Sequence, residues 1–255
     1  MKRFLVISDL HCGHEVGLTA PSHDITRGRL ARFSPMRKTI YKWAVKTIDA
    51  LRPIDVLLVN GDAIDGRGEK SGGLEQIEAD RFEQVDMAVQ FIKLIKPKHV
   101  IMAFGTSYHT GNKEDWEWGI AKKVGATIES EGNVEIEGNI INYRHHLGRS
   151  AIPHGRLTAI LRERLWNEEW ARRGEYPLAN IIIRSHVHYH KFGGDLDFFA
   201  LTTPAIQGYG TKFGTRVVSG TVDIGMVVFD FRGRRDYTWH VPHLRLKMHK
   251  ALRLS

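Results

Sequence analysis

Two stretches decide the fold that the sequence predicts: RFLVISDLH at residues 3–11 and IDVLLVNGDAID at residues 54–65. Each is a continuous apolar run that ends in acidic or imidazole side chains. Uninterrupted apolar runs of this length are typical of parallel strands buried on both faces. We therefore expect two buried strands that each lead directly into polar residues.

The rest of the chain alternates between predicted helices and strands. Ser34 and Pro35 mark the start of a helix that runs to about Leu51. In chain order, we then expect a helix over 74–95 with Phe82 on its apolar face, a strand over 99–104, a helix over 116–124, a hairpin over 134–144, a helix over 157–172, and strands over 180–184 and 222–231. This alternation implies parallel crossovers with helices packed on the sheet, in one α/β domain spanning residues 1–255.

Composition narrows the class of protein. Hydrophobic residues make up 42% and charged residues 26% of the 255 positions, which excludes a disordered, collagen-like or coiled-coil chain. The chain has no apolar run of about 18 residues, so we expect no membrane span. The single cysteine, Cys12, excludes an internal disulfide framework and favours a cytoplasmic protein.

The formal charge of +8 is concentrated near the C-terminus. From about residue 231 the chain carries seven Lys or Arg side chains against one acid, Asp236, which gives +6 in that segment. Such a basic segment is either a solvated end or a surface that binds a polyanion such as nucleic acid.

Five predicted strand ends present Asp or His, where ligands bind in open α/β sheets. The sequences at these ends are DLH (9–11), GDAID (61–65), GTSYH (105–109), HH (145–146) and SHVH (185–188). Taken alone, each sequence has an ordinary structural explanation, either as a turn or as a histidine whose ring nitrogens form hydrogen bonds within the fold. The pair His186 and His188 is more specific, because residues i and i+2 of an extended chain project to one side.

Together these residues predict a metal site. Asp9 and His11 have the same spacing as the histidine pair, and Asp62 adds a fifth ligand. Five nitrogen and oxygen ligands exceed what one tetrahedral ion needs, so two cations that share a carboxylate are expected. The count of 14 His against 1 Cys likewise favours imidazole and carboxylate ligands over thiolate.

These motifs resemble the calcineurin-like metallophosphoesterase family, whose pattern is Asp-x-His, Gly-Asp-x-x-Asp, Gly-Asn-His-Asp/Glu, a separate His, and Gly-His-x-His. The resemblance implies a four-layer α/β/β/α sandwich of two mixed sheets flanked by helices, with a binuclear site between the sheets. It implies that one metal is held by Asp9, His11 and His188, that Asp62 bridges, and that the second is held by His186 with His145 or His146. His145 is favoured because it comes first after the strand. Asp65 would orient a ligand histidine.

The third motif departs from the family pattern. GTSYH has no Asn beside the glycine, although the family's Asn is a ligand of the second metal. Either His109 or Asn112 reaches that metal, or the metal binds weakly; otherwise His109 is the catalytic group that acts on the leaving oxygen. Similar variants occur in phage and prophage members of the family. In the last motif Ser185 replaces a glycine.

The predicted function is metal-dependent hydrolysis of phosphodiesters, with nuclease activity as one form of it. Two divalent ions are expected, Mn²⁺ first, with Zn²⁺, Fe or Ni²⁺ as alternatives. The long connection over 12–34 brings Arg27 and Arg29 near the site, and Arg149 follows the fourth strand end, so these three are candidates for binding an anionic substrate. The alternatives are a small-molecule phosphomonoesterase or cyclic-nucleotide phosphodiesterase, and a catalytically impaired nucleic-acid-binding protein.

Overall fold

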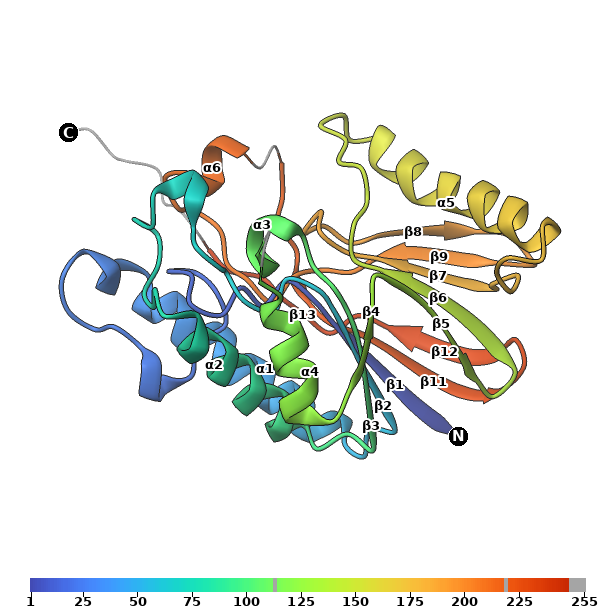
Figure 1. Ribbon diagram of the computed structural model, residues 1–255, viewed down its shortest axis with the longest axis horizontal. Helices are drawn as coiled ribbons and strands as arrows, with labels where there is room; N and C mark the ends of the chain where they lie inside the picture. The colour runs from blue at the N-terminus through green and yellow to red at the C-terminus, as the bar shows by residue number, and fades with distance from the viewer. Residues whose placement is uncertain (112–113, 218–219, 248–255) are drawn as a thin grey trace.

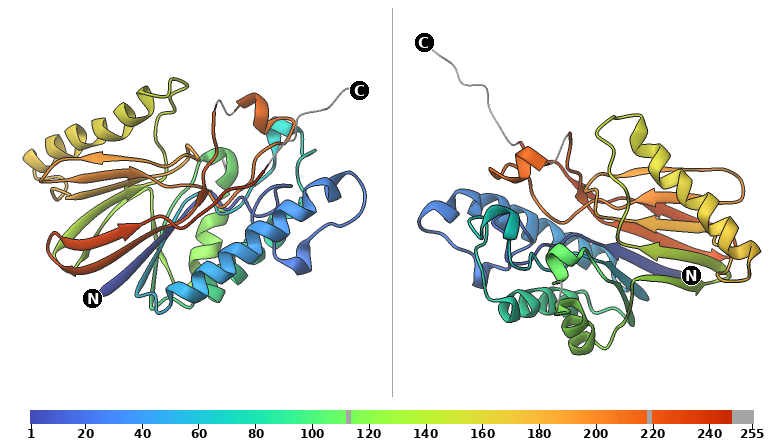
Figure 2. Two further views of the ribbon diagram at one scale, coloured as in Figure 1. Left: turned by 180° about the vertical axis from the view of Figure 1, so that it is seen from behind. Right: turned by 45° about the horizontal axis from the view of Figure 1, so that its top comes forward.

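Two β-sheets lie face to face in the computed structural model, and helices cover both outer faces (Figures 1 and 2). The structure describes residues 1–111, 114–217 and 220–247. The expected four-layer arrangement of helices, sheet, sheet and helix is confirmed, and three apolar clusters fill the spaces between the layers.

The first sheet is mixed, with a parallel centre. Its strands, in sheet order, are β12 (Asp236–His240), β11 (Val227–Gly233), β1 (Lys2–Ile7), β2 (Val56–Asn60), β3 (His99–Ala103) and β4 (Thr127–Glu129). The strands β1 to β4 are parallel, whereas β11 runs antiparallel to β1. Phe4, Leu5, Val6 and Ile7 are fully buried, as the uninterrupted apolar run predicts for a strand covered on both faces.

The second sheet is also mixed. Its order is β5 (Glu131–Ile136), β6 (Asn139–Arg144), β7 (Ile181–Arg184), β9 (Phe199–Thr202) and β8 (Lys191–Gly194). β5 and β6 form the predicted hairpin, whereas β6, β7 and β9 are parallel. Between the two sheets, Phe4 and Val6 of β1 belong to the same buried apolar cluster as Ile181 and Ile183 of β7.

Helices of unequal number cover the two outer faces. The first sheet is covered by α1 (Ser34–Leu51), α2 (Arg81–Ile95) and α4 (Trp116–Val124), and the second by α5 (Gly155–Arg172) (Figure 1). The short elements are η1 (Pro21–His23), η2 (Arg29–Phe33), η3 (Glu69–Ser71), α3 (Ser107–Thr110), α6 (Gly214–Val217), β10 (Ile224–Gly225) and β13 (His243–Leu244). Within the described ranges, none of the helices combines the length and hydropathy that a membrane span needs.

Two predicted boundaries are wrong. α2 begins at Arg81, seven residues after the predicted start, because the Asp80 side chain accepts the backbone N–H of Phe82 at 2.7 Å and caps the helix there. Phe82 is consequently 66% exposed and does not lie on the buried face. The strand predicted over 222–231 is divided, because β10 pairs with β13 whereas β11 pairs with β1.

Candidate metal centre

The five polar strand ends meet at one place. β1, β2 and β3 of the first sheet and β6 and β7 of the second end there, and the loops that follow them carry the Asp and His side chains. Sequence segments up to 179 residues apart, from Asp9 to His188, are in this way brought together. The side chains form two groups, called here the first and the second group.

The first group consists of Asp9, His11 and His188. Asp9 Oδ1 lies 3.1 Å from His188 Nε2 and 4.0 Å from His11 Nε2, and the two histidine Nε2 atoms are 3.4 Å apart. Adjacent atoms that ligate one ion at about 2.0–2.2 Å lie about 2.8–3.6 Å from one another in octahedral or tetrahedral geometry. The first group therefore has nearly the spacing that one cation requires.

The second group consists of Asp62, His145 and His186. Asp62 Oδ2 lies 3.0 Å from His145 Nε2 and 4.0 Å from His186 Nδ1. The other ring nitrogen of His145, Nδ1, donates to the carbonyl oxygen of Asn60 at 2.7 Å, which leaves Nε2 facing the group. Fixing the tautomer in this way prepares an imidazole for a metal.

The two groups form one continuous cluster. Asp9 Oδ1 of the first group lies 4.0 Å from His145 Nε2 of the second. His11, Asp62 and His109 form a third overlapping set of potential ligands. A pair of cations at this cluster would therefore share its central carboxylates.

The backbone is strained where the ligands lie. Five candidate ligands have positive φ angles, between 44° and 71°: Asp9, His11, Asp62, His186 and His188. Asp and His tolerate this left-handed region better than most residues, yet it still costs about 1–3 kcal/mol for each one. The i, i+2 pairs are thus not extended as the spacing predicted, and His186 and His188 contribute to different groups.

Electrostatics show that the cluster suits cations. Asp9 and Asp62 are buried, and their ion pairs within the described residues are all with histidines. Burial alone would raise the pKa of both carboxyls, but the surrounding imidazoles lower it. Burial would also lower the pKa of His145, yet Asp62 and Asp9 raise it to about 10. A proton on His145 thus balances negative charge that a divalent ion would balance more completely.

The buried polar atoms of the cluster also indicate a site that suits metal ions. Asp9 Oδ1 and His145 Nε2 are buried and form no hydrogen bond of normal geometry, although His188 Nε2 (3.1 Å) and Asp62 Oδ2 (3.0 Å) lie at ion-pair distance from them. A buried polar atom without a partner costs about 1–3 kcal/mol, so such atoms call for a ligand or another explanation. Burial and His109 lower the pKa of His11 to about 4, which keeps that imidazole neutral and able to bind a metal. The residues present therefore fit a metal pair.

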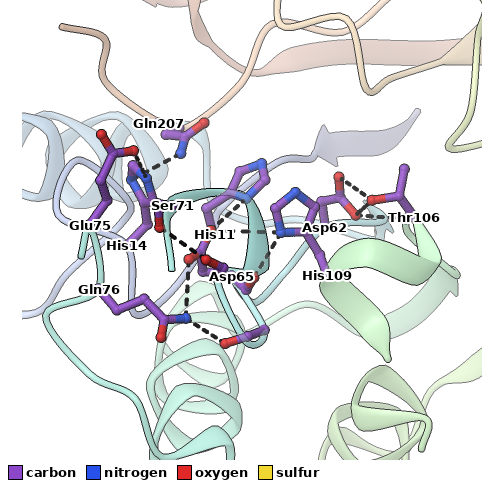
Figure 3. A network of polar contacts seen from close by, with 12 residues as sticks. His11, His14, Asp62, Asp65, Ser71, Glu75, Gln76, Thr106, His109 and Gln207 are labelled. Atoms are coloured by element: carbon purple, nitrogen blue, oxygen red, sulfur yellow. Dashed lines mark hydrogen bonds and ion pairs between the residues drawn. The ribbon is translucent and has the colours of Figure 1, made fainter. Parts of the chain in front are cut away.

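Asp65 lies behind the candidate ligands, and Figure 3 shows its surroundings. Its Oδ1 is 3.6 Å from His11 Nδ1 and 3.7 Å from His109 Nδ1. Its Oδ2 is 3.3 Å from Gln76 Nε2. Burial opposes ionisation, but His14 and His11 lower the pKa of Asp65 to about 2, so it is an anion. Asp65 is placed to orient His11 through the ring nitrogen that faces away from the first group.

The altered third motif holds the carboxylate of Asp62. The backbone N–H of Thr106 donates to Asp62 Oδ1 at 2.7 Å, and the Thr106 hydroxyl donates to the same oxygen at 3.1 Å (Figure 3). Oδ2 is thereby directed to His145. His109 groups with His11 and Asp62 and not with His145 and His186. Asn112, the other suggested ligand, lies outside the described residues.

Some residues proposed from the sequence are not among the three ligand sets. His146 belongs to none of the three ligand sets, and its ring stacks on His186 at 5.1 Å. Arg29 donates to the Leu74 carbonyl oxygen and lies 3.7 Å from Glu15. Arg27 and Arg149 are exposed. The substrate-binding role of these arginines stays a prediction.

Other residues that support the cluster were missed by the sequence analysis. Glu117 of α4 is fully buried and accepts the backbone N–H groups of Ala63 at 2.8 Å and Gly105 at 2.6 Å, which ties the loops after β2 and β3 together. Burial and the charge of Asp62 raise its pKa to about 7. Gly61, the first residue of the GDAID motif, leaves room for this arrangement, since a Cβ there would lie 2.5 Å from the His145 ring. Glu117 lies in an ordinary amphipathic pattern, so no sequence signal identified it.

No known family model matches the sequence, and no curated protein matches it. Among solved structures, the chain is similar to a novel archaeal phosphodiesterase, with a TM-score of 0.49 and 13% identity over 94% of this chain and 99% of that one. It is also similar to Vps29 of Chaetomium thermophilum (0.45, 12% identity, 96% and 97% covered) and to zinc-complexed Vps29 of Entamoeba histolytica (0.44, 14% identity, 94% and 98% covered). All three TM-scores lie below 0.5, so the activity must be inferred from the residues of the cluster.

Proposed function

We propose that this chain is a metal-dependent phosphoesterase of the calcineurin-like metallophosphoesterase family that hydrolyses phosphodiester bonds. The observation that carries the proposal is the pair of adjoining ligand groups, in which Asp9 Oδ1 approaches both His188 Nε2 (3.1 Å) and His145 Nε2 (4.0 Å). Adjacent metal sites about 3.5–4 Å apart are the arrangement that enzymes use for in-line phosphoryl transfer.

Each group would hold one divalent ion. Asp9, His11 and His188 would bind the first, and Asp62, His145 and His186 the second; Asp62 also groups with His11 and His109. Mn²⁺ is the first candidate, and Zn²⁺, Fe and Ni²⁺ also accept mixed imidazole and carboxylate ligands. When bound, the ions would lower the pKa of water and polarise the phosphoryl oxygens.

The protein's own residues supply orientation and a proton. His109 Nδ1 donates to the carbonyl oxygen of Asp65 at 2.8 Å, which leaves Nε2 for the leaving oxygen of the substrate. The Asp65 carboxylate lies 3.7 Å from the same ring and helps to hold its orientation. Thr106 fixes the direction of Asp62. His109 is therefore proposed as the general acid and Asp65 as a positioning residue.

The finer proposal is that the substrate is a polynucleotide. It rests on the formal charge of +8 and on the basic segment from about residue 231, of which Lys250 and Arg253 lie outside the described residues. Small phosphomonoesters or cyclic nucleotides are the alternative substrates. A catalytically impaired nucleic-acid-binding protein is the other alternative, favoured by the absence of an amide ligand beside Gly105.

The test combines metal analysis with hydrolysis. We expect about two Mn²⁺ ions per chain and hydrolysis of a bis-aryl phosphate that exceeds hydrolysis of an aryl monophosphate. Single-stranded and duplex DNA are then compared as polymeric substrates. Asp62→Ala should abolish activity and metal binding, whereas Asp86→Ala, at an exposed residue of α2, should leave both unchanged. Wild-type rates in Asp62→Ala would contradict the proposal, and a wild-type protein that binds no metal would favour the non-catalytic alternative.

A further inference from the structure

A cavity of about 230 Å³ lies beside His109. Its walls come from the loop after β2, from the first turn of α2, from α3 and from the segment that leads into α4, and they include Arg67, Arg81, Glu114 and Trp116. Drug-sized ligands occupy pockets of about 300–1,000 Å³, so this smaller cavity suits a compact group. None of its walls belongs to the two ligand groups of the metal centre.

Arg81 is the residue of this cavity that calls for a ligand. Its Nε is buried and has no hydrogen-bond partner. Its guanidinium lies 5.6 Å from the centre of the Trp116 ring, and that ring is held by an edge-to-face contact with Phe82 at 4.9 Å. Arg81 is also the first residue of α2, where the positive end of the helix dipole adds to its charge.

The acids on the cavity wall do not neutralise Arg81. Glu114 Oε2 lies 3.6 Å from Arg67 Nη2 and accepts the indole N–H of Trp116 at 3.0 Å. Glu69 also lines the cavity. Within the described residues, Arg81 forms no ion pair with either acid. A guanidinium with a buried unpaired N–H and an aromatic wall is suited to a phosphate group.

We propose that this cavity is an anion subsite, in which Arg81, assisted by Arg67, binds a second phosphate carried by the leaving part of the substrate. The inference rests on the proposed function, because His109 links the two places. A water oxygen forms the new bond to phosphorus, and the bond from phosphorus to the leaving oxygen breaks. The electron pair stays on the leaving oxygen, which takes the proton from His109 Nε2, and the proton released by water restores the imidazolium through solvent. The leaving group therefore departs on the His109 side, next to the cavity.

The proposal specifies the substrate class. A diester whose leaving group carries a further phosphate, as in an oligonucleotide, would engage both the metal centre and the subsite. A bis-aryl phosphate would engage only the metal centre. The wild-type enzyme should therefore prefer a dinucleotide with phosphates on both termini over the same dinucleotide without them, whichever side leaves.

The test measures this preference as the kcat/KM of the dinucleotide with terminal phosphates divided by the kcat/KM of the dinucleotide without them. Hydrolysis of the bis-aryl phosphate by each variant serves as the reference for activity at the metal centre. Arg81→Gln should reduce the preference about tenfold to hundredfold, the range of one charge-assisted hydrogen bond. Arg81→Lys should retain part of it. Arg162→Gln, at an exposed position of α5, serves as the matched control. An unchanged preference in a folded, active Arg81→Gln protein would overturn the proposal.

A binding measurement separates the subsite from the proposed activity. Calorimetry with inorganic phosphate on the chelator-treated full chain avoids binding by metal. We expect the wild type and Arg162→Gln to bind phosphate and Arg81→Gln to bind at least tenfold more weakly, with circular dichroism as the check on folding. Equal binding by all three refutes the subsite even if the chain hydrolyses diesters. Weaker binding by Arg81→Gln in a protein without hydrolytic activity supports an anion site and refutes the proposed function.

Discussion

Gly105→Ala should damage the metal centre without changing any candidate ligand. A Cβ at this position would lie 2.2 Å from Asp62 Oδ1 and 2.4 Å from the Asp62 backbone nitrogen, distances that real Cβ atoms do not adopt. The side chain of Asp62 could rotate away, but its backbone nitrogen is fixed at the end of β2. The loop must therefore move, and the contact between Asp62 Oδ2 and His145 Nε2 at 3.0 Å must lengthen.

The size of the effect follows from these contacts. Overpacking of this kind costs about 1–3 kcal/mol, and a chain of this size loses about 2–4 °C in Tm per kcal/mol. Displacing a group that supports a ligand typically lowers metal affinity about 10–100-fold. The measurements are thermal unfolding and Mn²⁺ titration by calorimetry. Gly119→Ala in α4 is the control, since its Cβ would meet nothing within 4 Å and the change should preserve or raise Tm. A wild-type Tm and metal affinity in Gly105→Ala would refute the reasoning.

Three further predictions concern metal binding, the loop over 12–34 and the cysteine. Mn²⁺ at 100 times its Kd should stabilise the chain by about 2.7 kcal/mol, seen as a rise in Tm that chelation reverses and Asp62→Ala lacks; an equal rise in that variant would contradict the site. Burial opposes ionisation of Asp24, but Ser34 and Arg37 lower its pKa, so its stabilisation should be complete above about pH 3.8 and lost as the pH falls further. Asp24→Asn should cost about 3–5 kcal/mol in urea unfolding at pH 7, because Arg37 is fully buried; a loss under 1 kcal/mol would refute this. Burial raises the pKa of Cys12 to about 12, so alkylation at pH 8 should be slow in the native protein and fast in urea, and rapid native labelling would contradict the buried position.

The sequence predicts the layers well because buried strands and amphipathic helices leave periodic patterns. The apolar residues Phe4 to Ile7 before Asp9 form the fully buried part of β1, and Ser34–Leu51 forms one helix as expected. The start of α2 was misjudged because residues 74–80 contain helix-forming side chains, whereas the cap at Asp80 depends on a local hydrogen bond. Asp80 is a preferred N-cap residue type, so it was a local signal for the true start that the apolar periodicity of residues 74–80 outweighed.

The candidate site was predictable in its residue types but not in its geometry. Strand ends identify Asp62 and His145, because each follows the end of a predicted strand within two residues. The left-handed backbone of His186 and His188 could not be deduced, since their spacing suits an extended chain equally well. The role of Glu117 could not be predicted for another reason. It depends on two backbone N–H groups from loops that are distant in the chain, and such contacts leave no pattern in the sequence.

Ligands from both sheets contribute to each metal group: Asp9 and Asp62 follow strands of the first sheet, and His145 and His188 follow strands of the second. Bound cations would therefore cross-link the two sheets at one end of the sandwich. Chelation should release this end while the apolar layer between the sheets holds the other. Amide hydrogen exchange should then become faster in all the loops that supply ligands, although they are distant in the chain, before any strand opens.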